Sequence, residues 1–422
     1  MGATYPVGQA SQAAYVRGAQ AAAKYVNANP EEVVIGPSTT QLLRNLSFAI
    51  KFKPGDELVL SPLEHEANLA SWVAIAERHD LTVKWWPIEV NRSPKLEVSK
   101  LKEVLSPKTK LVACTHASNI LATIHDIRAI ADAVHEVPGA IFVVDGVSFA
   151  PHRRVDVKAL DVDFYAFSWY KVYGPHIALL YGRKSRVDEL RSLGHYFNPQ
   201  ETLENKLGLA AANFELTQAI PVLVEYLGGD DPQSHFDAVA KHEGDLQSVL
   251  LGYLTSRKDI TVWGETTTDP TVRVPTVSFT VEGWNSKDLV ETIDVKSRFG
   301  LRWGHFYSHR LVTTILNDGK GLGDGGVVRV SMVHYNTGEF CKISVASSSP
   351  WPFLVKLMRV LCPCSGRDHR IRQDIGQHPK RKGISIRVWS WLSNFANPPT
   401  SQPFYSLSQG CDSLRHNYTA FL

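Results

Sequence analysis

The chain has 422 residues, a formal net charge of +3 and 44% hydrophobic residues, which is typical of a globular protein with two or three domains. Its apolar runs are shorter than the ~18–20 residues of a membrane-spanning helix. Its N-terminus has neither the basic nor the apolar part of a signal peptide, so we expect a cytoplasmic protein with no membrane partner. The five cysteines lack the paired spacing of a zinc site, and no metal is predicted.

Short apolar segments alternate with segments of helical periodicity through the first half of the chain. Strands are predicted at 31–36, 56–61, 82–88, 110–116, 139–145, 163–168 and 177–182, and helices at 38–50, 64–79, 98–105 and 126–137. Strands separated by helix-length segments are typical of βαβ units and a mostly parallel sheet. The strands are continuous apolar runs, as expected where both faces of a sheet are buried.

The pattern changes near residue 215. Two long helices are predicted at 215–228 and 234–257, and a shorter helix begins at Ser286. They are accompanied by apolar segments at 276–283, 300–307 and 327–335. We therefore predict an α/β fold with a large domain over residues 1–215 and a small α+β domain over 216–340. The glycine-rich segment 319–326 opens no helix, so we interpret it as a loop and not as a phosphate-binding motif.

Residues 341–422 differ from the rest in charge and periodicity. They contain 11 Lys/Arg and only 3 Asp/Glu, and they lack a sustained helical or strand repeat. We predict that this basic tail is disordered or loosely docked, and that it represents an intron read as coding sequence. A tail that binds nucleic acid is the alternative, but no recognisable motif supports it, so no nucleic-acid partner is expected.

Lys171 stands alone at the end of the apolar segment 163–170. A lysine condenses with an aldehyde only when part of it is unprotonated, and burial lowers the pKa of the amine. Asp145 ends an earlier apolar strand, where a carboxylate needs a cationic partner. The protonated ring nitrogen of pyridoxal phosphate is such a cation. The pair favours a lysine Schiff base, and a solvated turn lysine with a capping aspartate is the alternative.

Further polar residues follow other predicted strands. Thr39 and Thr40 open a helix, where hydroxyls and free backbone N–H groups favour a phosphate. His65 offers a flat ring for stacking, and Asn119 offers an amide for a ring hydroxyl. Each residue alone is equally compatible with a helix cap or a turn. Together they lie at the carboxyl ends of strands, where open α/β sheets bind ligands.

Five motifs occur in a consistent order: GPSTTQ (36–41), EHEAN (64–68), THASN (115–119), VVDGVS (143–148) and SWYKVYGP (168–175). In these motifs the sequence resembles the class V aminotransferase family of fold-type I pyridoxal-phosphate enzymes, in particular its cysteine-desulfurase-like branch. The resemblance covers roughly residues 2–337. It implies a transferase or lyase with a large domain, built on a mostly parallel sheet, and a small α+β domain.

The resemblance also implies roles for individual residues. Lys171 would form the Schiff base and carry the proton, Asp145 would contact the pyridine nitrogen, and His65 would stack on the ring. The ring hydroxyl and the phosphate would be bound by a further set of residues, which comprises Thr39, Thr40, Asn119, Ser148, Ser168 and Tyr170. Arg329 matches the arginine that binds the substrate α-carboxylate, a task suited to a guanidinium group.

The sequence departs from the desulfurase pattern at several places. Tyr307 stands where desulfurases have a nucleophilic cysteine, and a phenol cannot accept sulfur as a persulfide. Ala210 and Ala211 fall near the family's Gly-Thr, which reaches the phosphate of the partner subunit. The family's N-terminal segment is expected to be missing before residue 2, and its final helix is expected to be replaced by the tail.

These observations predict an enzyme that acts at Cα or Cβ of an amino acid by transamination, racemisation or elimination. We expect a homodimer with Tyr307 and Arg329 near the substrate, and we do not expect desulfuration of cysteine. The alternative is a catalytically impaired protein that keeps the pyridoxal-phosphate fold without turnover.

Overall fold

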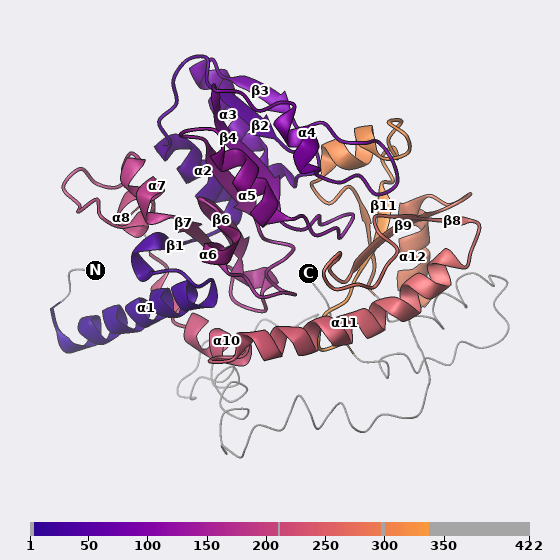
Figure 1. Cartoon of the computed structure of the whole chain (residues 1–422). Helices are drawn as coiled ribbons and strands as arrows, with labels where there is room; N and C mark the ends of the chain where they lie inside the picture. The colour runs from indigo at the N-terminus through magenta and orange to yellow at the C-terminus, as the bar shows by residue number, and fades with distance from the viewer. Residues whose placement is uncertain (1–3, 210–211, 297–299, 337–422) are drawn as a thin grey trace, which may run out of the picture. The chain divides into compact units, whose positions relative to one another are not determined.

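The computed structural model describes residues 4–209, 212–296 and 300–336 (Figure 1). All of them belong to one unit that contains two β-sheets. The predicted tail, 341–422, lies outside the described residues, as do Ala210 and Ala211. No helix in the described part of the chain is long and apolar enough to cross a membrane.

The larger sheet has seven strands in the order β1-β7-β6-β5-β4-β2-β3. Its strands are β1 (Val33–Gly36), β2 (Glu57–Leu60), β3 (Thr82–Trp85), β4 (Thr109–Thr115), β5 (Ile141–Asp145), β6 (Phe164–Ser168) and β7 (Ala178–Gly182). Parallel pairing joins five neighbouring strands, in the order β6, β5, β4, β2 and β3. Strand β7 is antiparallel to both β6 and β1. The prediction of a mostly parallel sheet is therefore confirmed.

Helices from the first half of the chain accompany this sheet (Figure 1). They are α1 (Pro6–Tyr25), α2 (Thr39–Ala49), α3 (Ala70–His79), α4 (Val98–Lys102), α5 (Ile127–His135), α6 (Val157–Leu160), α7 (Lys184–Glu189) and α8 (Leu203–Leu207). Successive residues of a strand enter different buried clusters. In β5, Phe142 and Val144 belong to one cluster, while Ile141 and Val143 belong to the other. Both faces of the sheet are buried, which explains the continuous apolar strands in the sequence.

The smaller sheet is antiparallel throughout and has the order β10-β11-β9-β8. It consists of β8 (Ile260–Trp263), β9 (Thr276–Val281), β10 (Arg302–Gly304) and β11 (Val327–Ser331). Helix α11 (Pro232–Thr255) contacts β8, and α12 (Ser286–Lys296) contacts β10 and β11. Arg302 pairs directly with Arg329 across β10 and β11. Opposed residues of neighbouring strands point to the same face, so the two guanidinium groups are neighbours.

The sequence-based helix assignment was wrong in one segment and incomplete in another. The single helix predicted over 215–228 is two short helices, α9 (Phe214–Thr217) and α10 (Ile220–Tyr226). Pro221 lies in the first turn of α10, where its missing N–H is not needed; inside one continuous helix it would remove a hydrogen bond. Helix α1 was not predicted, although Pro6 at its first position and its alanine-rich composition are helix-start and helix-forming signals.

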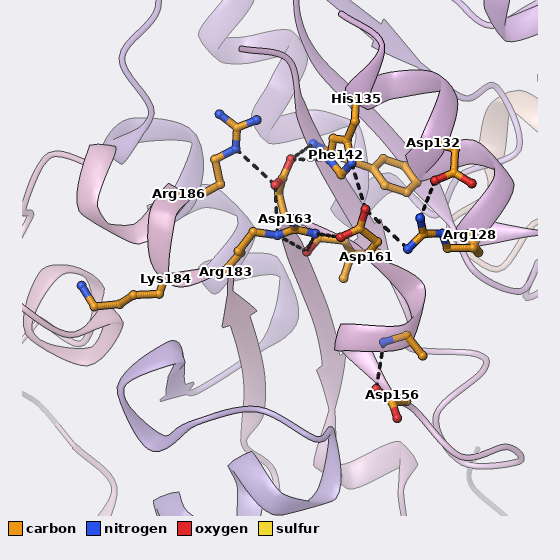
Figure 2. Close-up of polar contacts among 12 residues, drawn as sticks. Arg128, Asp132, His135, Phe142, Asp156, Asp161, Asp163, Arg183, Lys184 and Arg186 are labelled. Carbon is orange, nitrogen blue, oxygen red and sulfur yellow. Dashed lines mark hydrogen bonds and ion pairs between the residues drawn. The ribbon is translucent and has the colours of Figure 1, made fainter. Parts of the chain in front are cut away.

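A buried ionic network fixes the amino ends of the central strands (Figure 2). Asp163, immediately before β6, is 1% exposed. Its Oδ1 lies 3.2 Å from Nε of Arg186 and 3.6 Å from Nε of Arg183. Its Oδ2 accepts a hydrogen bond from the backbone N–H of Phe142 on β5 at 2.9 Å and lies 3.3 Å from Nε2 of His135 on α5. One carboxylate thus joins α5, β5, β6 and α7.

His135 lies between two carboxylates of this network (Figure 2). Its Nδ1 is 3.3 Å from Asp161, and its Nε2 is 3.3 Å from Asp163. The hydrogen bond to Asp163 raises the pKa of His135, and the charges of both aspartates add to this effect. Burial alone would raise the pKa of Asp163, but the hydrogen bond from His135 and the charge of Arg186 lower it below its ordinary value. The network is therefore most stable with His135 protonated and Asp163 ionised.

We predict that Asp163→Ala lowers the free energy of unfolding by about 3 kcal/mol, because it leaves a buried backbone N–H without its acceptor and removes the carboxylate that three cationic side chains share. Asp132→Ala is the matched control, since it removes an ion pair with Arg128 in which both side chains are more than half exposed. The control should cost under ~1 kcal/mol. Urea unfolding followed by circular dichroism measures both, and equal losses would contradict the prediction.

Candidate active site

A cavity of about 550 Å³ lies where β4, β5 and the β6–β7 turn meet residues of the smaller sheet. Eight of the residues predicted from sequence line it, namely Thr40, His65, Asn119, Ser148, Tyr170, Lys171, Tyr307 and Arg329. The other three, Thr39, Asp145 and Ser168, are buried and are not among the lining residues. The volume is in the usual range for a small-molecule site.

A tight turn between β6 and β7 fixes Lys171. Residues Trp169–Lys171 form one turn of 3-10 helix directly after β6. The carbonyl oxygen of Trp169 accepts hydrogen bonds from the backbone N–H groups of Val172 and Gly174, both at 2.8 Å. A Cβ on Gly174 would lie 2.6 Å from a methyl carbon of Leu223 and 3.0 Å from the Trp169 carbonyl oxygen. This close packing favours glycine at position 174, and the turn fixes the backbone of Lys171 at the cavity wall.

Lys171 and Asp145 are two opposite charges that do not form an ion pair. Asp145 ends β5, is 4% exposed and accepts a hydrogen bond from the backbone N–H of Val147 at 2.9 Å. Within residues 4–209, 212–296 and 300–336, no cationic side chain lies within ion-pair distance of it. Burial raises the pKa of Asp145, and the charge of Lys171 opposes this rise. Burial lowers the pKa of Lys171; Asp145 opposes the shift, and Arg329 adds to it.

Glu64 is a buried carboxyl group beside Asp145 that the sequence reasoning missed. It is 1% exposed and accepts hydrogen bonds from the backbone N–H of Thr115 and from Nδ2 of Asn68, both at 2.8 Å. Burial raises its pKa to about 8, and the negative charge of Asp145 contributes. A glutamate next to His65 at the end of an apolar segment was the available signal, but the same pattern also fits an exposed residue at a helix start.

His65 is both a helix cap and a cavity residue. Its Nδ1 accepts a hydrogen bond from the backbone N–H of Ala67 at 3.0 Å, which caps a short 3-10 turn. Burial lowers the pKa of His65 to about 4, and the charges of Lys171 and Arg329 add to this effect. The ring is therefore neutral at pH 7, with its hydrogen on Nε2. A neutral ring held by its own backbone suits stacking against a flat ligand.

The two predicted threonines have different environments. Ser38, and neither threonine, is the side-chain cap of α2, since its Oγ accepts a hydrogen bond from the backbone N–H of Gln41 at 3.1 Å. The hydroxyl of Thr39 is buried and lies 2.8 Å from the hydroxyl of Ser168. Thr40 is exposed and lines the cavity. Thr39 and Ser168 therefore join the start of α2 to the end of β6, and Thr40 is the threonine at the cavity surface.

Asn119 holds the loop that contains Tyr307. Its Nδ2 donates a hydrogen bond to the carbonyl oxygen of Phe306 at 3.0 Å, and its Oδ1 accepts one from the hydroxyl of Ser308 at 2.7 Å. The backbone N–H of Glu66 donates to the carbonyl oxygen of Tyr307 at 2.7 Å. The second N–H of the Asn119 amide remains able to donate to a ligand. The loop is thus fastened to Asn119, which is predicted to contact the cofactor, and to the backbone of Glu66.

The same loop places an aromatic ring between two arginines. The ring centre of Phe306 is 4.0 Å from the guanidinium carbon of Arg329 and 5.4 Å from that of Arg302. Nη1 of Arg329 also donates to the carbonyl oxygen of Asn119 at 3.1 Å. Phe306 and Tyr307 have φ of 49° and 60°, a conformation that L-residues rarely adopt and that often marks functional loops. Tyr307 is 65% exposed, and its ring centre lies 5.3 Å from that of His65.

The residues around the cavity fit pyridoxal phosphate. The buried carboxylate of Asp145 has no cationic partner within ion-pair distance among the described residues, and the cofactor's protonated ring nitrogen is such a partner. The buried amine of Lys171 matches its aldehyde, and the neutral ring of His65 matches its flat face. No group of three or more His, Cys, Asp and Glu side chains that could hold a metal ion occurs within the described ranges.

Comparisons with known proteins agree with this arrangement. Residues 3–340 match the family model described as aminotransferase class-V. The aminotransferase-like protein FGM3 of Gibberella zeae is 56% identical over 340 residues, which cover 80% of this chain and 83% of that protein. The cysteine desulfurase-like protein ustD of Aspergillus flavus is 41% identical over 325 residues, which cover 75% of this chain and 73% of that protein.

Solved structures give the same result at the level of the fold. The apo structure of a cysteine desulfurase from Thermococcus onnurineus NA1 has a TM-score of 0.68 and 26% identity, and the match covers 79% of this chain and 82% of that one. The chain therefore belongs to the class-V aminotransferase family of pyridoxal-phosphate-dependent enzymes and has the fold-type I architecture of its cysteine-desulfurase-like members.

Proposed function

We propose that this protein catalyses a reaction at Cα or Cβ of an amino acid, with pyridoxal phosphate bound covalently through Lys171. The observation that supports this most strongly is that Lys171, which lines the cavity, and the buried Asp145 influence each other's pKa without forming an ion pair. When bound, the cofactor serves as an electron sink for the bonds that break at Cα.

We assign the remaining residues by their places around the cavity. Asp145 stabilises the charge of the ring nitrogen, and His65 stacks on the ring. The ring hydroxyl and the phosphate contact the residues assigned to them from sequence, with Thr40, Tyr170, Ser148 and Asn119 at the cavity surface and Thr39 and Ser168 behind it. Arg329 binds the α-carboxylate of the substrate, and Tyr307 lies near its side chain.

Lys171 is the residue best suited to move a proton at Cα. Its burial lowers the pKa of the amine, so a larger share of it is neutral and able to accept a proton near pH 7. The nearby charges of Arg329 and Arg302 act in the same direction. The turn after Trp169 holds this amine at the cavity wall, as general acid–base catalysis requires.

We predict that the holoenzyme exchanges the α-proton of at least one amino acid in D2O, measured by proton NMR over a panel of the twenty common amino acids. Lys171→Ala should slow this exchange by about 10²–10⁴-fold, because it removes the group that carries the proton. Lys241→Ala is the control, since this lysine of α11 is an exposed partner of Asp245. Exchange that survives in Lys171→Ala, or is absent for the whole panel, contradicts the proposal.

We predict no sulfide release from cysteine above the background of free pyridoxal phosphate. A thiolate is the attacking species in desulfuration, and the phenol of Tyr307 is a poor sulfur nucleophile. Tyr307→Cys should not restore the activity fully, because Trp303 and Phe306 also differ from the desulfurase loop and Asn119 fastens this loop. Sulfide evolution by the unmodified protein that is lost in Lys171→Ala would overturn the prediction.

We further propose a homodimer and a cytoplasmic location, as the sequence predicts. Exposed apolar side chains on the paired helices α1 and α10, including Val7, Val16 and Val222, support the first proposal. Sedimentation of the full chain at micromolar concentration should give a dimer that Val222→Glu weakens. Val295→Glu, at an exposed position of α12, is the control. A monomer that binds the cofactor would refute the dimer.

A further inference from the structure

His152 is a cavity residue to which the proposed function assigns no role. A short segment with turns connects Asp145 to His152. In this segment the backbone N–H of His152 donates a hydrogen bond to the carbonyl oxygen of Phe149 at 3.0 Å. The residue lines the same cavity as Lys171, and its side chain is 10% exposed. Its Nδ1 lies 2.8 Å from Oε1 of Glu243, which belongs to α11.

Glu243 is fully buried and is bound by a second group. Its other oxygen, Oε2, accepts a hydrogen bond from Nη1 of Arg153 at 2.8 Å. The guanidinium of Arg153 is fixed in turn, because Nε donates to the carbonyl oxygen of Pro270 at 3.0 Å and Nη2 donates to that of Arg273 at 3.2 Å. Arg153 thus supplies the positive charge that the buried carboxylate needs, and His152 is not required to supply it.

This arrangement determines which nitrogen of His152 bears the hydrogen. A carboxylate only accepts hydrogen bonds, so the nitrogen that faces Glu243 must donate. In its neutral form the imidazole then has its hydrogen on Nδ1 and a free lone pair on Nε2. Among the described residues, no side chain or backbone group hydrogen-bonds to this Nε2, which lies at the end of the ring away from Glu243. His152 therefore presents an acceptor on a cavity wall.

Within the described part of the chain, three of the four charged side chains on the cavity wall are donors, and the fourth, Glu66, is an exposed acceptor. Lys171, Arg302 and Arg329 bring positive charge and N–H groups, which match a phosphate and a carboxylate. The acceptor Nε2 of His152 cannot bind a phosphate or a carboxylate in this way, and it matches a hydrogen-bond donor on the ligand instead. We propose, on the basis of the function proposed above, that Nε2 of His152 accepts a hydrogen bond from a donor on the substrate's side chain, such as a hydroxyl group. Glu243 and Arg153 are positioning residues for this contact.

The tautomer is tested directly, without any substrate. In the full-length holoenzyme labelled with ¹⁵N-histidine, NMR should show His152 with hydrogen on Nδ1 and a lone pair on Nε2. The signals are assigned by their absence in His152→Gln. Glu243→Gln should shift His152 toward the other tautomer, because the glutamine amide can donate to Nδ1. A wild-type protein with hydrogen on Nε2 of His152 overturns the proposal, whatever reaction the enzyme catalyses.

The contact is tested by affinity for pairs of amino acids that differ by one hydroxyl group. Titration of the holoenzyme's absorption spectrum with L-serine and L-alanine, and with L-threonine and L-2-aminobutyrate, should show tighter binding of the hydroxyl member by about fivefold, the size of one net hydrogen bond. His152→Leu should abolish this preference and leave the affinity for alanine unchanged.

Glu243→Gln should also reduce the hydroxyl preference, whereas His235→Leu, on the same helix but outside the cavity lining, should retain it. Equal affinity within each pair for the wild-type enzyme, or a preference that survives in His152→Leu, overturns the proposal. The α-proton exchange experiment is independent of this outcome. Exchange without a hydroxyl preference would contradict only the role of His152, and a lack of exchange with every amino acid would contradict the proposed function itself.

Discussion

The amine of Lys171 at the wall of the cavity and the buried carboxylate of Asp145 near it are charges of opposite sign that are not paired with each other. Burial of an unpaired charge is costly, and both groups respond with pKa values shifted toward the neutral form. A ligand that offers an aldehyde on one side and a cationic ring nitrogen on the other satisfies both groups at once. The pKa of the buried Glu64 rises to about 8, chiefly through burial, so this neighbour of Asp145 is mostly neutral near pH 7.

The strands that bear these two groups are fixed at both ends. Asp145 ends β5 and Lys171 follows β6, so both groups lie at the carboxyl edge of the large sheet. At the opposite ends of the same strands, Asp163 joins the backbone of Phe142 to His135 and Arg186 (Figure 2). The smaller sheet contributes its two arginines through the direct pairing of β10 and β11. The loop that follows β10 is fastened to Asn119, and its Tyr307 lines the cavity.

Much of the fold and of the site was predictable, because it depends on local patterns. Alternating strands and helices indicate parallel pairing, and parallel strands bring the residues at their carboxyl ends together, as for His65, Asn119 and Asp145. The missed features are contacts between distant segments. Nothing in the local pattern joins Glu243 to His152. The contact between the hydroxyls of Thr39 and Ser168 was not predicted either, because it depends on how α2 packs on β6. The break between α9 and α10 was visible at Pro221 but was not used.

Chemical identification of the residue that holds the cofactor tests the central claim most directly. The purified holoenzyme is reduced with borohydride, digested and analysed by peptide mass mapping, with the full chain used as it is expressed. A pyridoxyl group on the peptide that contains Lys171 is the predicted result. A label on a different lysine, or no label on protein that had the absorption spectrum of bound cofactor, would contradict the account.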